Sequence, residues 1–144
     1  MTALAASRDT QRLGDEGCTT LLPQMPVAAA VTCYKGGIAV VDTTGGVRPG
    51  RTSTTDVALG IFLDDVDNHA GALGAQVARI RRGIFLFTNL STDPVLVATA
   101  GAKVYVTDDA TVQVSAGGAR IAAGTCYGID ARTSQVIVQI GINS

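Results

Sequence analysis

The chain has 144 residues, with 11 basic and 12 acidic side chains and a formal charge of −1 at neutral pH. This length suits one domain with its own core, and the balanced charge argues against DNA-packing and polybasic membrane proteins. Charged residues make up 16% of the chain, below the roughly 25% of soluble domains, which is typical of a surface that partners cover. No apolar run is long enough to span a bilayer, so we expect no membrane partner.

The composition predicts an all-β fold. Sixteen valines, nine isoleucines and seventeen threonines stand against one glutamate and two lysines. Branched side chains favour strands, whereas glutamate and lysine favour helices. Seventeen glycines and four prolines supply turns. We therefore predict a small barrel or sandwich of about eight short antiparallel strands.

The first 33 residues differ from the rest. The segment Leu21–Val27 is apolar but contains two prolines, each of which fixes its own φ and favours extended geometry in the residue before it. We expect an extended N-terminal arm over residues 1–33 and a β-barrel or sandwich domain over residues 34–144. A short helix over Ala3–Leu13, ended by Gly14, is an alternative for the start of the arm.

Strand signals become dense after residue 33. Apolar or alternating runs lie between clusters of Gly, Asp, Asn, Ser and Pro, which favour turns. These runs predict strands at 38–41, 57–63, 76–82, 83–88, 103–107, 111–114, 125–129 and 136–142. Residues 95–98 fit either a short strand or one helical turn.

A weak internal repeat runs through these strands. In each copy a lysine leads into an apolar strand, followed by a Gly-Ile pair and then by a strand that starts with Gln-Val. The first copy comprises Lys35, Ile38–Asp42, Gly60-Ile61 and Gln76–Ile80, and the second comprises Lys103, Val104–Asp108, Gly128-Ile129 and Gln135–Ile140. Either two packed copies of one unit or chance similarity between valine- and glycine-rich strands explains this pattern.

The sequence offers little for catalysis. The single histidine, His69, lies in a loop of small and polar residues, and no nucleophile, phosphate-loop or metalloprotease motif is present. The densest acidic group is Asp64, Asp65 and Asp67, which fits a turn better than a cation site or a catalytic pair. Three cysteines without C-x-x-C spacing indicate reduced, apolar residues rather than a disulfide framework. We expect no catalytic residue, no metal ligand and no cofactor.

One basic cluster, Arg79 to Arg82, lies in a predicted strand. Arg79 and Arg81 share a face there, and their guanidinium groups suit ion pairs at a subunit interface or a solvated face. Nucleic acid is a weaker interpretation, because it calls for more arginines with aromatic residues between them. The residues that we predict to contact a partner are Leu21, Leu22, Met25, Val27, Arg79 and Arg81.

The region from Tyr34 to Ile142 resembles the small decoration, or cement, proteins of tailed-phage and prophage capsids. The residues that carry the resemblance are Tyr34–Asp42, Leu59–Asn68, Arg79–Phe85, Lys103–Val112, Ala123-Gly124, Gly128–Asp130 and Val136–Val138. They form strand and turn patterns rather than a chemical signature, so no residue role is carried over.

The resemblance implies a virion structural protein without catalysis. Such proteins bind the outer surface of the major capsid shell, often as homotrimers near symmetry axes, and stabilise it by bridging capsomers. The expected partners are the major capsid protein and further copies of this chain, and the expected location is the capsid surface of the virion after synthesis in the host cytoplasm. A terminal arm often contacts the shell, so deletion of residues 1–30 is expected to leave a folded domain that no longer binds.

Two other functions stay open. One is a different phage structural subunit, such as a head fibre base or a tail component, because the same β composition suits it. The other is a β-barrel module that binds carbohydrate or nucleic acid. The position of the protein in a purified particle, or binding of such a ligand by the isolated domain, separates these alternatives from the decoration protein.

Overall fold

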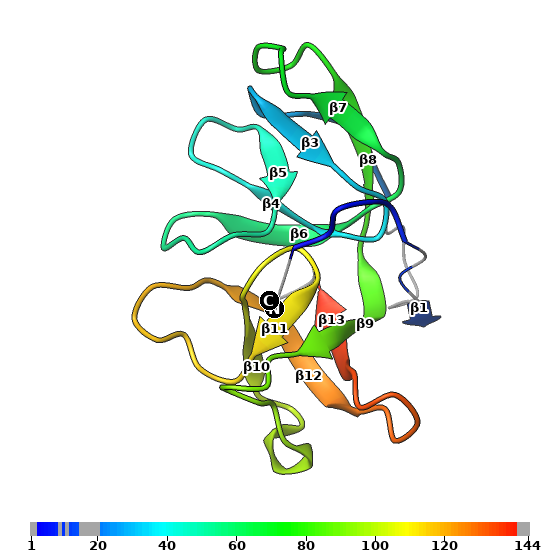
Figure 1. The fold of residues 1–144 in the computed structure, drawn as a ribbon, viewed down its shortest axis with the longest axis vertical. Coiled ribbons are helices and arrows are strands. Elements are labelled where there is room, and N and C mark those ends of the chain that lie inside the picture. Colours follow the sequence, from blue (N-terminus) through cyan, green and yellow to red (C-terminus); the bar gives the residue numbers. More distant parts are fainter. Residues whose placement is uncertain (1–2, 9, 11, 15–20, 141–144) are drawn as a thin grey trace.

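A computed structural model of the chain describes residues 3–8, 10, 12–14 and 21–140 (Figure 1). In this part the chain forms thirteen strands and one short 3-10 turn, η1 (Val97–Thr99), which confirms the all-β prediction. The strands are β1 (Arg12–Gly14), β2 (Leu21–Pro26), β3 (Val31–Cys33), β4 (Ile38–Val41), β5 (Val47–Pro49), β6 (Val57–Phe62), β7 (Val66–Asn68), β8 (Val77–Arg81), β9 (Gly83–Asn89), β10 (Lys103–Val106), β11 (Thr111–Gln113), β12 (Ala122–Ile129) and β13 (Val136–Ile140).

Two details of the prediction differ from the structure. The described strands outnumber the expected eight or so because β1, β2, β3, β5 and β7 have no predicted counterpart. Four of these have only three residues, and strands this short show no alternation in the sequence. The fifth, β2, lies in the proline-containing segment that we expect to be an extended arm. The alternative helix over Ala3–Leu13 is wrong, because the described residues of that range are irregular or belong to β1.

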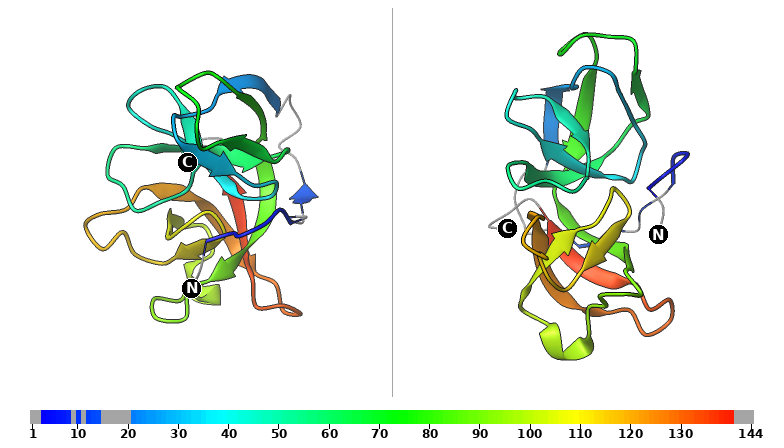
Figure 2. Two further views of the ribbon diagram at one scale, coloured as in Figure 1. Left: turned by 45° about the horizontal axis from the view of Figure 1, so that its top comes forward. Right: turned by 60° about the vertical axis from the view of Figure 1, so that its left-hand side comes forward.

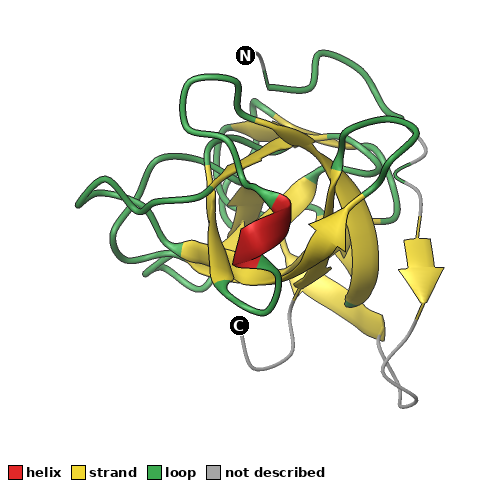
Figure 3. Cartoon of the chain, turned by 90° about the horizontal axis from the view of Figure 1, so that it is seen from below, coloured by secondary structure: helices red, strands yellow, loops and turns green. Residues whose placement is uncertain are grey.

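The C-terminal half forms a closed barrel. Its strands follow one another in the order β9, β11, β10, β12 and β13, and pairing of β13 with β9 closes the ring. The pair β9–β11 is parallel and the other pairs are antiparallel, so the antiparallel prediction fails at one pair. Seen from below, η1 lies in front of this ring of strands (Figure 3).

The N-terminal half also forms a ring of five strands, in the order β2, β8, β6, β4 and β5. A parallel bridge between Val27 and Val47 joins the end of β2 to β5, and the Ala28 N–H donates to the Val47 carbonyl over 2.9 Å. We call this ring the first barrel and the C-terminal one the second barrel. They are stacked along the long axis of the molecule, and the pair β3–β7 lies at the outer end of the first barrel (Figures 1 and 2).

The two barrels have the same strand order. β2, β4, β5, β6 and β8 correspond to β9, β10, β11, β12 and β13, with the same neighbours and the same directions. The register agrees between β4–β5 and β10–β11, since the pair Val41–Val47 corresponds to Val106–Val112. The pairing of β2 with β8 differs, because it has a register shift between Leu22 and Met25 that the pairing of β9 with β13 lacks. The hydrogen bond from Ala28 likewise has its counterpart between Leu90 and Val112. The internal repeat that the sequence indicates is therefore a repeat of whole barrels.

The structure shifts the register of that repeat. In the first barrel, Gly60 of β6 pairs with Ala39 of β4. The corresponding pair in the second barrel is Gly124 with Val104. The counterpart of Gly60 is therefore Gly124, and not the Gly128 that the sequence pattern suggests. A methyl group at Gly60 would overlap the carbonyl oxygen of Arg81 in the next strand, and one at Gly124 would overlap that of Gln139. This close approach of the neighbouring strand explains why both positions are glycine.

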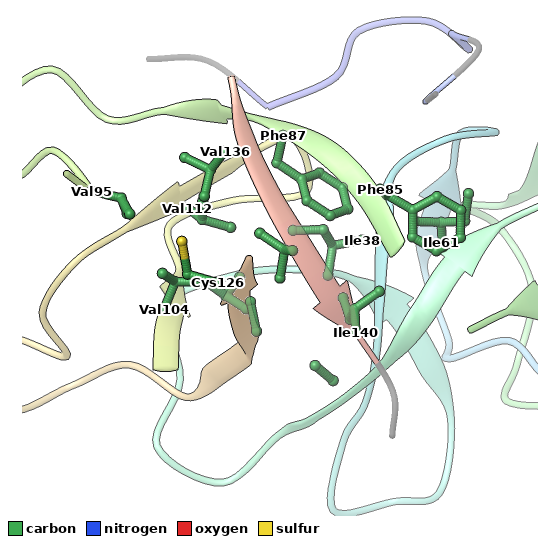
Figure 4. Close-up of a cluster of buried hydrophobic side chains, with 14 of the residues drawn as sticks. Ile38, Ile61, Phe85, Phe87, Val95, Val104, Val112, Cys126, Val136 and Ile140 are labelled. Atoms are coloured by element: carbon green, nitrogen blue, oxygen red, sulfur yellow. The ribbon is translucent and has the colours of Figure 1, made fainter. Parts of the chain in front are cut away.

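Each barrel has its own core, and β4 and β6 contribute to both. Ile38 and Val40 of β4, with Ile61 of β6, enter the core of the second barrel, where they meet Phe85 and Phe87 (Figure 4). The residues that alternate with them, including Ala39 and Phe62, enter the first-barrel core, whose other buried members are Val27, Cys33, Val47, Val66, Ala78 and Ile80. Burial on both faces accounts for the continuous apolar runs in these strands and joins the barrels into one body.

The N-terminal segment is part of this body. Val27 is fully buried in the first-barrel core, and the expected boundary between residues 33 and 34 lies inside the first barrel, because β2 precedes the boundary and pairs with β8 beyond it. Further upstream, the Leu4 N–H donates to Asp109 Oδ1 over 2.7 Å and the Arg8 N–H donates to the Lys35 carbonyl over 3.0 Å. The described part of the expected arm therefore contacts the chain's own domain.

Candidate interaction surface

The residues predicted to contact a partner come together in the structure. Leu21, Leu22 and Met25 lie on β2, Val27 directly follows it, and both arginines lie on the neighbouring strand β8. The strands run antiparallel, with Leu21 opposite Arg81. Two segments that are far apart in the sequence thus form one continuous piece of sheet.

Side-chain alternation divides the predicted contact residues into two sets. Val27, which is fully buried, and Leu22 and Met25, which are partly buried, pack against the first-barrel core, so they hold the proline-containing segment to its own body. Arg79 and Arg81 alternate with Ala78 and Ile80, which enter the core, and therefore point outward. We define the β8 surface as Leu21, Val77, Arg79 and Arg81.

The β8 surface combines an exposed apolar side chain with guanidinium groups. Val77 is 53% exposed. Arg79 forms a bidentate ion pair with Asp64, in which Nε donates to Oδ2 over 2.9 Å and Nη2 donates to Oδ1 over 2.7 Å. This hydrogen bonding holds the pKa of Asp64 below its ordinary value. The pair is exposed, so it adds little to stability, but it fixes the position of the Arg79 guanidinium on the surface.

The acidic segment that follows β6 and continues into β7 consists of separately partnered carboxylates. Asp64 binds Arg79, Asp65 accepts from the Lys35 N–H over 2.9 Å, and Asp67 lies 2.6 Å from His69 Nδ1. The side chains of His69 and Asp67 are 72% and 61% exposed, and hydrogen bonds from His69 lower the pKa of Asp67. Within the described residues no three His, Cys, Asp or Glu side chains are placed to hold a metal ion.

A pocket of about 170 Å³ lies where the N-terminal segment meets the seam between the two barrels. We call it the junction pocket, and its lining residues are Arg8, Thr10, Lys35, Gly36, Ile61, Phe62, Leu63, Arg81 and Phe85. Arg81 is among the residues that the sequence predicts to contact a partner, but Arg8 and Phe85 are not. No sequence signal could have joined them, because the pocket forms only when the two barrels pack together and the N-terminal segment crosses their seam.

Burial makes the thiols of the two described cysteines unreactive. Cys33 and Cys126 are free and buried. Burial raises the pKa of the Cys33 thiol to about 12 and also raises that of Cys126, so neither forms the reactive thiolate at neutral pH. The third cysteine, Cys18, lies outside the described residues.

Comparisons of the chain with protein-family models, with curated proteins and with solved structures find no match. The described part of the chain contains no helix of the length and apolarity that crossing a membrane requires. The site itself, an outward sheet surface and a small cationic pocket, can bind and position other molecules.

Proposed function

We propose that this chain is a virion structural protein, a decoration protein that binds the outer surface of the major capsid shell and stabilises it by bridging capsomers. The observation that carries the proposal is the β8 surface: the chain presents arginine and apolar side chains together on a body whose two cores share β4 and β6. Arginine is enriched at interfaces between proteins, and the fully buried centre of an interface is more apolar than the rest of a protein surface. The resemblance of Tyr34–Ile142 to decoration proteins supplies the identity of the partner.

The double barrel suits adhesion by repeated weak contacts. The two barrels are joined because β4 and β6 contribute side chains to both cores. The β8 surface therefore lies on a packed body, and binding through it does not carry the entropic cost of ordering a loop. A standard contact covers about 800 Å² of each partner, a modest part of the 6666 Å² surface of this chain. Many copies on one shell then supply avidity that a single contact lacks.

The proposal includes the assembly and location that the resemblance implies. Copies of the chain associate as a homotrimer near the symmetry axes of the shell, at the virion surface, after synthesis in the host cytoplasm. Light scattering during gel filtration measures the mass of the free protein and tests the trimer.

Co-sedimentation with bare shells of the major capsid protein from the same genome tests the proposed function. The full chain is expected to pellet with shells, and Arg79→Glu to lose most of this binding, because a carboxylate there repels Asp64 and removes the guanidinium from the β8 surface. Arg132→Glu makes the same charge change in the exposed turn after β12 and should bind normally. Equal binding by all three proteins, or by none, would contradict the proposal, and labelling the particle separates a shell position from a fibre base or a tail.

A further inference from the structure

The lining of the junction pocket is partly apolar and partly cationic. Its apolar part, which we call the floor, consists of the buried residues Ile61, Phe62 and Phe85. Arg8 and Arg81, from segments far apart in the sequence, add guanidinium groups to the lining. Lys35 adds a third basic residue to the lining. A pocket with this chemistry favours a ligand that has both an apolar stem and a negative end.

Both arginines hold a buried nitrogen for which the described residues provide no hydrogen-bond partner, Nη2 of Arg8 and Nε of Arg81. Arg8 Nε does bind, donating to Thr10 Oγ1 over 3.2 Å, so its guanidinium is held in place while Nη2 stays unpaired. Buried donors are nearly always paired in folded proteins. Both nitrogens are themselves closed to solvent, so a ligand would meet the remaining guanidinium nitrogens of the two arginines. The two groups nevertheless bring incompletely paired positive charge to the lining of one pocket.

The second barrel provides an internal comparison. The position of Arg81 in β8 corresponds to Gln139 in β13, since Arg81 lies opposite Ile61 and Gln139 lies opposite Thr125 at the same place in the repeat. Gln139 Oε1 accepts a hydrogen bond from the Tyr127 hydroxyl over 2.9 Å. At equivalent positions of the two barrels, the second barrel thus has a neutral side chain with a hydrogen-bond partner, and the first barrel has a guanidinium group with an unpaired nitrogen.

The size and lining of the pocket select the ligand. A volume of about 170 Å³ is below the roughly 300–1,000 Å³ of pockets that take small-molecule cofactors, but it accommodates one side chain. Guanidinium groups pair with carboxylates through charge-assisted hydrogen bonds. A glutamate fills the apolar floor with its methylene stem, which a bare phosphate ion does not.

We propose that the junction pocket binds a glutamate side chain presented by a partner protein, with Arg8 and Arg81 holding the carboxylate. This inference deepens the proposed function, because it names the chemistry that the capsid surface would offer. Arg8 belongs to the N-terminal segment, so the site is complete only while that segment lies across the seam between the barrels.

The test is an NMR titration of the ¹⁵N-labelled full chain, observed at the Nε–Hε resonances of both arginines. The probe is N-acetyl-glutamate-N-methylamide, and its neutral control is the glutamine analogue. We expect a saturable shift with the glutamate probe only. Arg81→Gln, which introduces the side chain of the corresponding position in β13, should weaken the remaining response at Arg8 about tenfold, whereas Arg132→Gln should leave both resonances and the affinity unchanged.

Three outcomes would overturn the proposal: an equal response to the glutamine analogue, unchanged affinity in Arg81→Gln, or equally tight binding of inorganic phosphate, which would mark a general anion site. The titration contains no capsid. Its failure therefore leaves the decoration proposal standing, and failure of shell binding leaves the pocket standing.

Discussion

The first barrel should collapse when β2 is removed. Deleting residues 1–27 takes away a strand paired with β8 together with three side chains of the first-barrel core: Val27, which is fully buried, and Leu22 and Met25, which are partly buried. Full burial of one such side chain contributes about 1.5–3 kcal/mol, and each lost backbone hydrogen bond about 0.5–1.5 kcal/mol.

The sum of these losses is about 5–10 kcal/mol, which is as large as the whole stability of many domains. We therefore expect the truncated chain to lack a cooperative transition for the first barrel, in contrast to the folded domain that the sequence alone suggests after deletion of residues 1–30. Deletion of residues 1–20 is the control, because it keeps β2. Urea and thermal unfolding followed by circular dichroism measure both, and a midpoint for the longer deletion within about 2 °C of the full chain would refute this reasoning.

Three further predictions concern single positions. Gly60→Ala and Gly124→Ala should each lower the free energy of unfolding by about 2–4 kcal/mol, because each added methyl group meets a backbone carbonyl of the next strand. Urea unfolding measures both variants. A lower free energy of unfolding in only one of them would contradict the equivalence of the two positions. Cys33 and Cys126 should resist iodoacetamide in the folded protein, read by mass spectrometry with the third cysteine replaced by serine, and rapid labelling would contradict their burial. Burial raises the pKa of Asp109, so the stability of the protein should fall as the pH rises above the ordinary carboxyl pKa, where the buried group loses its proton. Calorimetry should show that Asp109→Asn melts at a higher temperature than the native chain at about pH 7 and at no higher temperature at about pH 3. An equal difference in melting temperature at both pH values would contradict this expectation.

Much of the fold is predictable because long apolar strands and turn residues are local signals. The runs at β4, β6, β9 and β13 show strand patterning, and the order of the repeat is visible in residue types. Closure of the first barrel is not predictable, because it depends on one bridge between Val27 and Val47. The register of the repeat is also hidden, since the glycines at 60 and 124 are set by the backbone of the next strand rather than by their neighbours in sequence.

The candidate site is predictable only in part for the same reason. The sequence identifies the proline-containing segment and the arginine strand, but not that they pair or that alternation turns Leu22 and Met25 inward. An apolar segment broken by prolines has the same composition whether it covers a neighbour or its own core. The junction pocket needs Arg8 and Arg81 together, and only the packed fold brings them to one place.

A cryo-EM reconstruction of bare capsid shells incubated with the full chain would show whether the protein binds the shell and which of its surfaces makes the contact. We expect added density on the outer surface of the shell, shaped as stacked double barrels, with the β8 surface turned toward the capsid protein. Shells that carry no added density at saturating protein, or barrels attached with β8 facing solvent, would contradict this expectation.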